Sequence, residues 1–164
     1  MDDTQRKEIG TVLGRVPSGI FILTVGDGQG HETGMLCSWV QQAAFDPPLL
    51  TLALKQGRYV NDWLQQSRRA VLNLVGESGK EFLGHFGRGF KIEEPAFEGI
   101  EFTRLPSGLP VLTDALGFLE CEVLSQTEVG DHVIHILEVK SVGAGEMLHE
   151  ERPMVHVRKN GFHY

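Results

Sequence analysis

The residues of this sequence most able to do chemistry are seven histidines and two cysteines. His132 and His135 are three positions apart, a spacing at which two imidazoles on one helix could share a metal ion. The run HVIHILEV around them is typical of a strand, where residues an odd number of positions apart point to opposite faces. The pattern therefore predicts no metal site. His132 follows Gly130 and Asp131 in an expected turn, where its imidazole could face a ligand or be an ordinary turn residue.

The two cysteines, Cys37 and Cys121, are far apart and belong to no CxxC or zinc-binding pattern. A cysteine acts as a nucleophile when a neighbouring base or positive charge stabilises its thiolate, and the sequence indicates no such base. Both are interpreted as small buried residues. The sequence also lacks Ser-x-x-Lys, Gly-x-Ser-x-Gly and paired-acid signatures, so it does not indicate acyl transfer or glycoside hydrolysis.

The segment Gly34–Lys55, GMLCSWVQQAAFDPPLLTLALK, has an unusual first half. Its second half, LLTLALK, alternates as a half-buried strand does. In the first half Ser38, Trp39 and two glutamines stand where a core strand would be aliphatic, and the Asp-Pro-Pro that follows prevents regular strand pairing. Some backbone N–H groups should therefore lack a strand partner, which costs about 1–3 kcal/mol each when they are buried. A planar ligand with a polar edge would satisfy them; the alternative is a bulged edge strand hydrated by water.

Two glycine-containing segments allow both a functional and a structural interpretation. GDGQG, residues 26–30, contains Gly-x-Gly, but a dinucleotide-binding loop needs a helix directly after it, and HETGMLCSWV is typical of a strand. We therefore expect a hairpin turn. GHFGRGF, residues 84–90, either ends a helix and enters a turn or forms a flexible cationic lip over a flat or phosphorylated ligand. The residues alone do not separate these two alternatives.

The elements that must position these residues are short strands joined by turns. Strands are expected at 18–25, 31–40, 49–55, 69–75, near 99–104, at 115–126, 132–143 and in the final PMVHVRKNGFHY. Helices are expected at 4–14, at 59–67, where Val60, Trp63 and Leu64 share one face, and after Ser78, which forms a capping-box pattern with Glu81. Antiparallel hairpins dominate, so the predicted fold class is mostly β with short helices, with six or seven antiparallel strands in a closed or nearly closed barrel.

The composition is that of an ordinary globular domain. Of the 164 residues 41% are hydrophobic, and no linker-like segment divides the chain, so one domain over residues 1–164 is expected. The net charge of −7 and the pI of about 5.5 argue against nucleic acid as a partner. The start MDDTQRKEIG lacks the apolar core of a signal peptide, and no apolar run approaches the roughly 20 residues of a membrane span. These features predict a cytoplasmic protein that is not associated with a membrane.

Several motifs in one order resemble the flavin reductase-like, FMN-binding split-barrel family. GMLCSWVQQAAFDPPLLTLALK resembles the family's Gly-Met-Thr-x-Ser-Ser, Asp-Pro-Pro and apolar-strand signature. RAVLNLV is similar to its Val-Asn-Val strand, GHF to its Ala-x-x-Phe helix end, and GDHVIHILEV to its Gly-Asp-His hairpin. The Met-Leu-x-Ser-Trp-Val form and the ending HVRKNGFHY are similar to the branch found in cyanobacterial flavodiiron proteins and in rubredoxin reductases.

The resemblance implies a Greek-key-like split β-barrel that forms a homodimer and holds FMN, or FAD in its place, near the dimer interface. The ring edge and the ribityl phosphate would be contacted by Met35, Leu36, Cys37, Ser38 and Trp39. Backbone groups would reach the pyrimidine side from Gln42, Ala43 and Ala44. The phosphate would be faced by Lys55 and Arg58. The open face of the ring would be bordered by His85, Phe86 and His132, the last being the expected catalytic residue.

The resemblance further implies an NAD(P)H-dependent flavin reductase that passes electrons to free flavin or to a redox protein such as rubredoxin, a flavodiiron protein or a monooxygenase. Hydride transfer from nicotinamide to flavin needs close stacking and no acid–base pair, which agrees with the lack of a catalytic constellation. Two alternatives stay open: an FMN electron-transfer module like flavoredoxin, without its own nicotinamide site, and a barrel that has lost flavin. Leu36 and Trp39, which replace hydroxyl residues of the family pattern, favour the last alternative.

Overall fold

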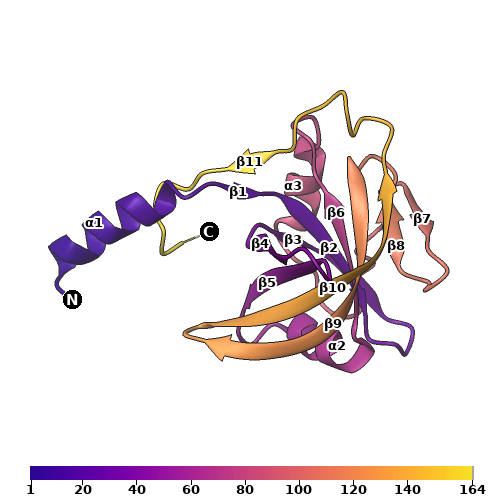
Figure 1. Cartoon of the computed structure of the whole chain (residues 1–164), viewed down its shortest axis with the longest axis horizontal. Coiled ribbons are helices and arrows are strands. Elements are labelled where there is room, and N and C mark those ends of the chain that lie inside the picture. The colour runs from indigo at the N-terminus through magenta and orange to yellow at the C-terminus, as the bar shows by residue number, and fades with distance from the viewer. Residues whose placement is uncertain (164) are drawn as a thin grey trace.

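The chain folds into a curled antiparallel sheet flanked by helices (Figure 1). The computed structural model describes residues 1–163. The helices are α1 (Asp3–Gly14), α2 (Tyr59–Ser67) and α3 (Lys80–Phe86). The strands are β1 (Ser18–Gly19), β2 (Phe21–Gly26), β3 (Glu32–Cys37), β4 (Val40–Ala44), β5 (Leu49–Lys55), β6 (Arg69–Leu74), β7 (Phe102–Arg104), β8 (Pro110–Leu112), β9 (Gly117–Val129), β10 (His132–Ala144) and β11 (Val155–His156). The mostly β fold class predicted from the hairpin-rich sequence is confirmed.

Seven of these strands form one antiparallel sheet in the order β3-β2-β6-β9-β10-β5-β4. The two edge strands, β3 and β4, follow each other in the chain and are separated only by Ser38 and Trp39. Because the chain from Cys37 to Val40 spans at most about 11 Å, the sheet has to curl until its two edges approach each other. β3 and β4 do not pair, so the barrel stays open between them. We call this opening, from Cys37 to Val40, the seam.

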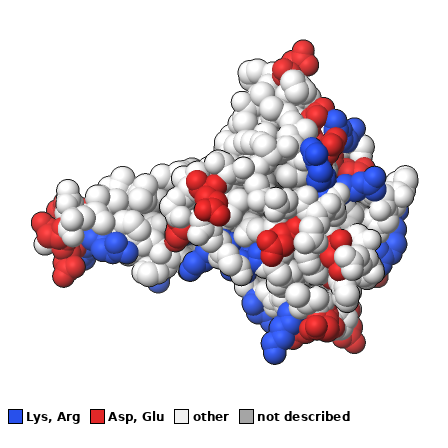
Figure 2. All heavy atoms as spheres, turned by 90° about the horizontal axis from the view of Figure 1, so that it is seen from below, with Lys and Arg blue, Asp and Glu red and all other residues white. Residues whose placement is uncertain are grey.

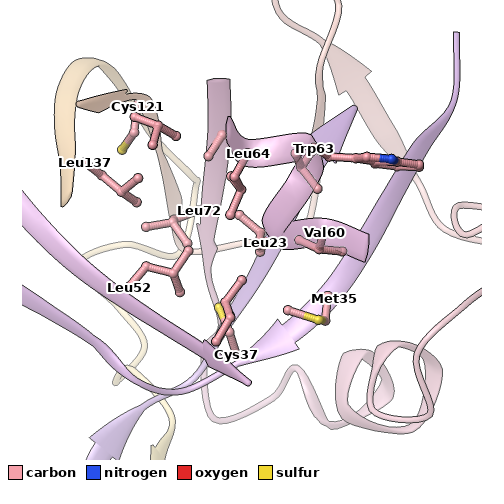
Figure 3. Packing of buried hydrophobic residues seen from close by; sticks show 14 of the residues in the cluster. Leu23, Met35, Cys37, Leu52, Val60, Trp63, Leu64, Leu72, Cys121 and Leu137 are labelled. Atoms are coloured by element: carbon pink, nitrogen blue, oxygen red, sulfur yellow. The ribbon is translucent and has the colours of Figure 1, made fainter. Parts of the chain in front are cut away.

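Side chains from several strands and from α2 fill the interior of the barrel (Figure 3). The alternation of LLTLALK predicts that Leu50, Leu52 and Leu54 share one face, and all three are buried in this core, with exposed fractions of 9%, 0% and 3%. The helical spacing of Trp63 and Leu64 is also confirmed, since both side chains enter the same cluster. Burial of each such side chain contributes about 1.5–3 kcal/mol, so this core holds in place the strands that frame the seam.

α1 projects from the barrel as an arm, and the end of the chain runs back along it (Figure 1). The helix expected at 4–14 is confirmed and has Asp2 as its N-cap. Main-chain hydrogen bonds hold the tail, from Arg158 N to Gly14 O at 2.9 Å and from Gly161 N to Gly10 O at 2.6 Å. A Cβ on Gly10 or Gly14 would collide with the tail, so the close approach needs glycine. No helix in the described part of the chain is long and apolar enough to cross a membrane.

The start of α3 differs from the expectation. The capping box of Ser78 and Glu81 is not formed, because the helix begins after Gly79 without a capping side chain. Ser78 instead donates hydrogen bonds from its backbone N and its hydroxyl to the carboxylate of Glu151. A carboxylate from a distant part of the chain has thus taken the role that the local pattern assigned to Glu81.

Several strands also differ from their expected ranges, among them the strand expected at 31–40, which ends at Cys37, and the final strand, which is only β11. The strand expected at 18–25 is interrupted at Ile20, whose N–H donates to Met154 O, so that β1 pairs with β11 instead of continuing into β2. The strand expected near 99–104 is only β7, and it pairs with β8, for which no strand was expected. β9 and β10 pair with each other out to the pair of Val129 and His132, so β9 is longer than expected.

Candidate functional site

A cavity of about 380 Å³ opens at the seam of the barrel. We call it the seam cavity; its lining residues are Ile20, Met35, Leu36, Cys37, Ser38, Trp39, Ala53, Leu54, Lys55, Arg58, Leu83, Gly87 and His156. Its volume is within the range of about 300–1,000 Å³ that is usual for small-molecule sites. The predicted contacts from Met35 to Trp39, together with Lys55 and Arg58, all lie on its wall. The fold therefore brings together residues from both ends of the sheet.

The strands beside the seam each have a strand partner on one side only. β3 pairs with β2, where Cys37 lies opposite Phe21, and β4 pairs with β5, where Val40 lies opposite Leu52. At the turn between them, Trp39 O accepts a hydrogen bond from Ala53 N at 2.9 Å. The main-chain groups on the other side of β3 and β4 are not used by any strand of the described residues. They are available to a ligand or to a second protein.

The inner wall of the seam cavity is apolar, and its cysteine is not ionised. Met35 and Cys37 are each 7% exposed. Burial raises the pKa of the Cys37 thiol to about 12, so the thiol stays protonated at neutral pH. Burial also raises the pKa of Cys121, in the barrel core, to about 12. Neither thiol is prepared to act as a nucleophile, which agrees with the interpretation of both as small buried residues.

Two cations stand at one side of the seam cavity. Lys55 ends β5, and Arg58 is the N-cap of α2. Arg58 Nη1 donates a weak hydrogen bond to Met35 Sδ at 3.8 Å, a neutral acceptor that leaves the charge of the guanidinium available. A buried network supports the turn between the cations: Asn61 Nδ2 donates to Lys55 O at 2.9 Å, and Asn61 Oδ1 lies 2.8 Å from His135 Nε2. His135 is therefore a support of the cationic turn, a role that the sequence did not indicate.

Trp39 connects His132 to the seam cavity. The ring centroids of Trp39 and His132 are 4.6 Å apart, and the guanidinium carbon of Arg158 lies 5.1 Å from the centre of the Trp39 ring. His132 Nδ1 lies 2.7 Å from Asp131 Oδ1, and this hydrogen bond lowers the pKa of the Asp131 carboxyl. His132 itself does not line the cavity. It contacts a residue that does.

The predicted contacts on β4 lie beyond the seam cavity. Gln42, Ala43 and Ala44 do not line it, and the first two are exposed on β4. Phe45, the next residue, is 90% exposed. Any contact from these three residues to a ligand stays a prediction, and it would have to extend outward from the cavity along the edge of the sheet.

The end of α3 reaches the seam cavity through different residues from those expected. Phe86 is 1% exposed and packs inside a core cluster, so its ring does not line the cavity. His85 turns toward the following loop, where its Nε2 lies 2.8 Å from Ala96 O. The residues of this helix end that line the cavity are Leu83 and Gly87. The seam cavity thus meets this helix end through Leu83 and Gly87, and a contact of His85 or Phe86 with a ligand stays a prediction.

His156 lines the seam cavity and was not among the expected contacts. It reaches the cavity because β11 pairs antiparallel with β1, with His156 opposite Ser18. The only signal in the sequence is the ending HVRKNGFHY, which marks the segment as part of the family pattern. That pattern does not say where the histidine lies in space.

The lining of the seam cavity suits a flat, partly apolar ligand with a negative charge at one end. Apolar side chains and a neutral thiol cover the inner wall, and the strand edges at the seam carry main-chain donors and acceptors. Lys55 and Arg58 stand to one side. An FMN molecule has a ring with apolar faces and a polar edge, and it ends in a phosphate, so these residues fit FMN.

Comparisons with known proteins identify the family of the chain. Residues 13–163 match the family described as the flavin reductase like domain. Diflavin flavoprotein A 1 of Synechocystis is 37% identical over 153 residues, which are 93% of this chain and 26% of that protein. The chain thus spans about a quarter of the length of this relative.

Solved structures share the fold. The styrene monooxygenase flavin reductase of Pseudomonas putida is 30% identical, with a TM-score of 0.74 over 90% of each chain. The NADH:FAD oxidoreductase of Streptomyces globisporus has a TM-score of 0.83 at 21% identity, over 96% of this chain and 92% of that one. The split-barrel architecture expected from the resemblance is therefore confirmed. With a family match over nearly its whole length, the chain belongs to the flavin reductase-like domain family.

Proposed function

We propose that the protein is an NAD(P)H-dependent flavin reductase that binds FMN in the seam cavity and passes electrons to free flavin or to a partner redox protein. The observation that carries the proposal is the convergence of Met35–Trp39, Lys55 and Arg58 on one cavity at the open side of the barrel. The named activity of the styrene monooxygenase flavin reductase, 30% identical over 90% of this chain, supports it. FAD carries the same ring and could use the same cavity.

Main-chain groups and cations are the proposed means of holding the flavin. Leu36 and Trp39 stand where the family pattern has hydroxyl residues, so the phosphate has to rely on Ser38, on backbone N–H groups and on Lys55 and Arg58. Hydrogen bonds to a charged group are worth about 1.5–3 kcal/mol each, and less where water screens them.

A bound flavin supplies the ring that accepts a hydride from nicotinamide. The task of the chain is then to orient the ring and to keep the seam cavity in shape. His132 is proposed to act through Trp39, because the ring centroids of its imidazole and of the indole are 4.6 Å apart and the indole lines the cavity. No acid–base pair is required of the surrounding residues.

We also propose a homodimer and an electron-accepting partner protein. In diflavin flavoprotein A 1 a segment like this chain forms about a quarter of the protein, which supports a flavodiiron protein as the partner. The likeness to the flavin reductase named for styrene monooxygenase supports a monooxygenase instead. Exposed apolar residues such as Phe45, which follows β4 at the edge of the sheet, support contact with a second protein.

The direct test is a titration of the purified protein with FMN, followed by flavin fluorescence, and then rapid mixing of the FMN-loaded protein with NADH or NADPH. We expect quenched fluorescence on binding and loss of flavin absorbance on mixing. Unchanged fluorescence would contradict flavin binding. Loss of absorbance only with a reduced protein would indicate an electron-transfer module without its own nicotinamide site.

Arg58→Ala tests the phosphate contact. We expect the Kd for FMN to rise about tenfold, or about 1.4 kcal/mol, because Arg58 is exposed and its contact with the phosphate is partly screened. The Kd for riboflavin, which has no phosphate, should stay the same. Arg69→Ala is the matched control, since this arginine starts β6 and does not line the seam cavity. Equal weakening of riboflavin and FMN would show that Arg58 does not contact the phosphate.

A further inference from the structure

A second cavity, of about 430 Å³, adjoins the seam cavity. It lies between β3, the start of α2 and the loop after α3, and we call it the basic cavity after its charged residues Arg58, Arg88, Lys91 and Glu94. Met35 and Arg58 line both cavities. A ligand held in the seam cavity can therefore extend past Arg58 into the basic cavity.

The basic cavity concentrates positive charge in a chain whose net charge is −7. Three of its four charged side chains are cations. In addition, α2 begins at its wall with Arg58 as the N-cap, and although Asn61 N donates to Arg58 O, no capping side chain accepts from the first N–H groups of the helix. Guanidinium groups and open helix N-termini are both favourable partners for phosphate.

The carboxylate of Glu94 already occupies donors that a phosphate would use. Its Oε2 accepts a hydrogen bond from Lys91 N at 2.7 Å and lies 3.5 Å from Arg88 Nη1. The hydrogen bond from Lys91, helped by the charge of Arg88, lowers the pKa of Glu94, so this carboxyl is ionised at neutral pH. A phosphate entering the basic cavity would meet attraction from the cations and repulsion from this one group.

Tyr59 ties together the walls of the basic cavity. Its hydroxyl donates to Phe90 O at 2.9 Å and lies 3.2 Å from Thr33 Oγ1, which joins α2 to the loop and to β3. The guanidinium carbon of Arg88 lies 4.3 Å from the centre of the Phe90 ring. Because the loop is anchored in this way, its cations are held at the cavity.

We propose that the basic cavity binds the phosphorylated adenosine half of FAD, so that FAD fills both cavities and FMN fills only the seam cavity. The inference rests on the proposed function, because it needs the flavin ring in the seam cavity. Glu94 sets the preference between the two flavins, since its carboxylate opposes the additional phosphate. NAD(P)H carries an adenylate of the same chemistry, and the experiment below separates the two sources.

The test is an equilibrium titration of riboflavin, FMN and FAD, followed by flavin fluorescence without nicotinamide. Glu94→Gln keeps an oxygen that can accept the Lys91 N–H but removes the charge; we expect FAD to bind about fivefold more tightly and FMN to change less than about twofold. Arg88→Gln should weaken FAD about fivefold with the same small effect on FMN. Glu93→Gln, one residue earlier and outside the cavity lining, is the matched control and should change none of the three.

Equal effects of Glu94→Gln or Arg88→Gln on FMN and FAD, or no effect on either flavin, would overturn the assignment. A change confined to the Michaelis constant for NADH or NADPH would assign the basic cavity to the nicotinamide dinucleotide, which also overturns it. If the unaltered protein binds none of the three flavins, the proposed function itself fails and this inference fails with it. Thermal melts followed by circular dichroism verify that each variant is folded.

Discussion

At the scale of single residues, one buried histidine supports the turn between Lys55 and Arg58. His135 is fully buried, and its Nε2 donates to Asn61, which in turn holds Lys55 O. Its Nδ1 has no hydrogen-bond partner among residues 1–163. Protonation of this nitrogen would leave a buried charge without compensation, so the imidazole is neutral in the folded protein.

This arrangement predicts how stability depends on pH. Burial lowers the pKa of His135 to about 4, below the value of about 6.5 expected in the unfolded chain. The unfolded chain therefore binds more protons between these two values, and the folded protein loses stability as the pH falls from about 6.5 to about 4. Over this pH range, the free energy of unfolding of the unaltered protein should fall by about 2–3 kcal/mol more than that of His135→Gln, which lacks the imidazole.

Urea denaturation at several pH values measures this difference. Glutamine keeps an N–H that can donate to Asn61, so the variant isolates the titration of the imidazole. His149→Gln, at an exposed position, is the control and should keep the full pH dependence. If both variants have the same pH profile as the unaltered protein, the buried imidazole does not account for the acid sensitivity.

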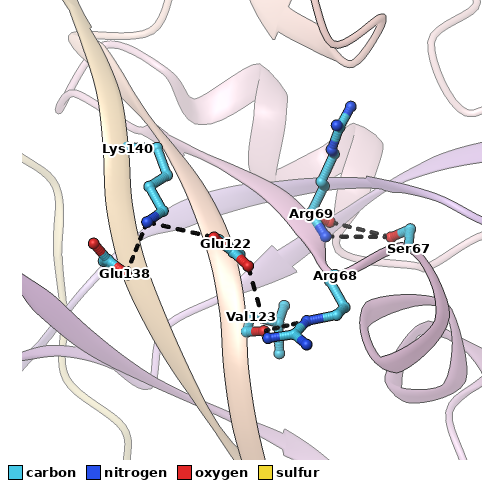
Figure 4. Close-up of polar contacts among 7 residues, drawn as sticks. All are labelled: Ser67, Arg68, Arg69, Glu122, Val123, Glu138 and Lys140. Atoms are coloured by element: carbon cyan, nitrogen blue, oxygen red, sulfur yellow. Dashed lines mark hydrogen bonds and ion pairs between the residues drawn. The ribbon is translucent and has the colours of Figure 1, made fainter.

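At the scale of elements, the end of α2 shows how a helix is fastened to the sheet (Figure 4). Arg68 follows the helix with a φ of 54°, a left-handed conformation that costs a non-glycine residue about 1–2 kcal/mol. Its side chain donates from Nε to Val123 O at 3.0 Å and reaches Glu122 at 3.7 Å. Lys140 lies 3.4 Å from the same carboxylate. These contacts offset the backbone cost by joining α2 to β9.

Two substitutions at Arg68 separate the cost of its backbone conformation from the stabilisation by its side-chain contacts. Arg68→Ala keeps the left-handed cost and loses the contacts, so it should destabilise the protein by about 1–2 kcal/mol. Arg68→Gly loses the same contacts but relieves the backbone, and should be about 1 kcal/mol more stable than Arg68→Ala. At Arg69, which lies in β6, we expect the alanine variant to be more stable than the glycine variant, because glycine weakens a strand. Urea denaturation gives both orders, and alanine being the more stable residue at position 68 would contradict the account.

At the scale of the whole molecule, the arm formed by α1 carries an uncovered apolar stripe. One side of α1 is covered by the tail, which also contacts Leu13 at Gly161, while Ile9 and Val12, followed by Val16, repeat at helical spacing on another side. Val12 is 70% exposed and Val16 57%. Figure 2 shows charged side chains at the free end of the arm and mostly uncharged atoms between that end and the barrel. Such a surface normally meets another protein, and the proposed homodimer would cover it.

Val12→Glu tests this role of the arm. Placing a carboxylate in the stripe should weaken the homodimer at least about tenfold, as a shift toward monomer in sedimentation velocity. Thr11→Glu adds the same charge to α1 outside the stripe and should leave the dimer intact. A monomeric unaltered protein would contradict the proposed homodimer, and an unchanged dimer in Val12→Glu would place its interface elsewhere, with the exposed Phe45 as the next candidate.

The sequence by itself determined the local elements and the neighbourhood of the site. The alternation of LLTLALK and the helical spacing of Trp63 and Leu64 concern residues close together in the chain, and the structure realises both. The same holds for the seam: the irregular residues Met35–Trp39 are contiguous, and one hairpin returns the chain to Lys55 and Arg58 beside them. Short-range patterns were sufficient for the strand and the helix, whereas the grouping of Met35–Trp39 with Lys55 and Arg58 was expected from the family resemblance.

Only the tertiary structure decided which distant residues complete the site. The pairing of β1 with β11 brings His156 to the seam cavity, and packing against a second core cluster removes Phe86 from it. Glu151 takes the donors of Ser78, and His132 contacts the seam cavity only through Trp39, which lines it. Each of these outcomes depends on strand register and on the packing of the complete barrel, and no local pattern of residues contains that information.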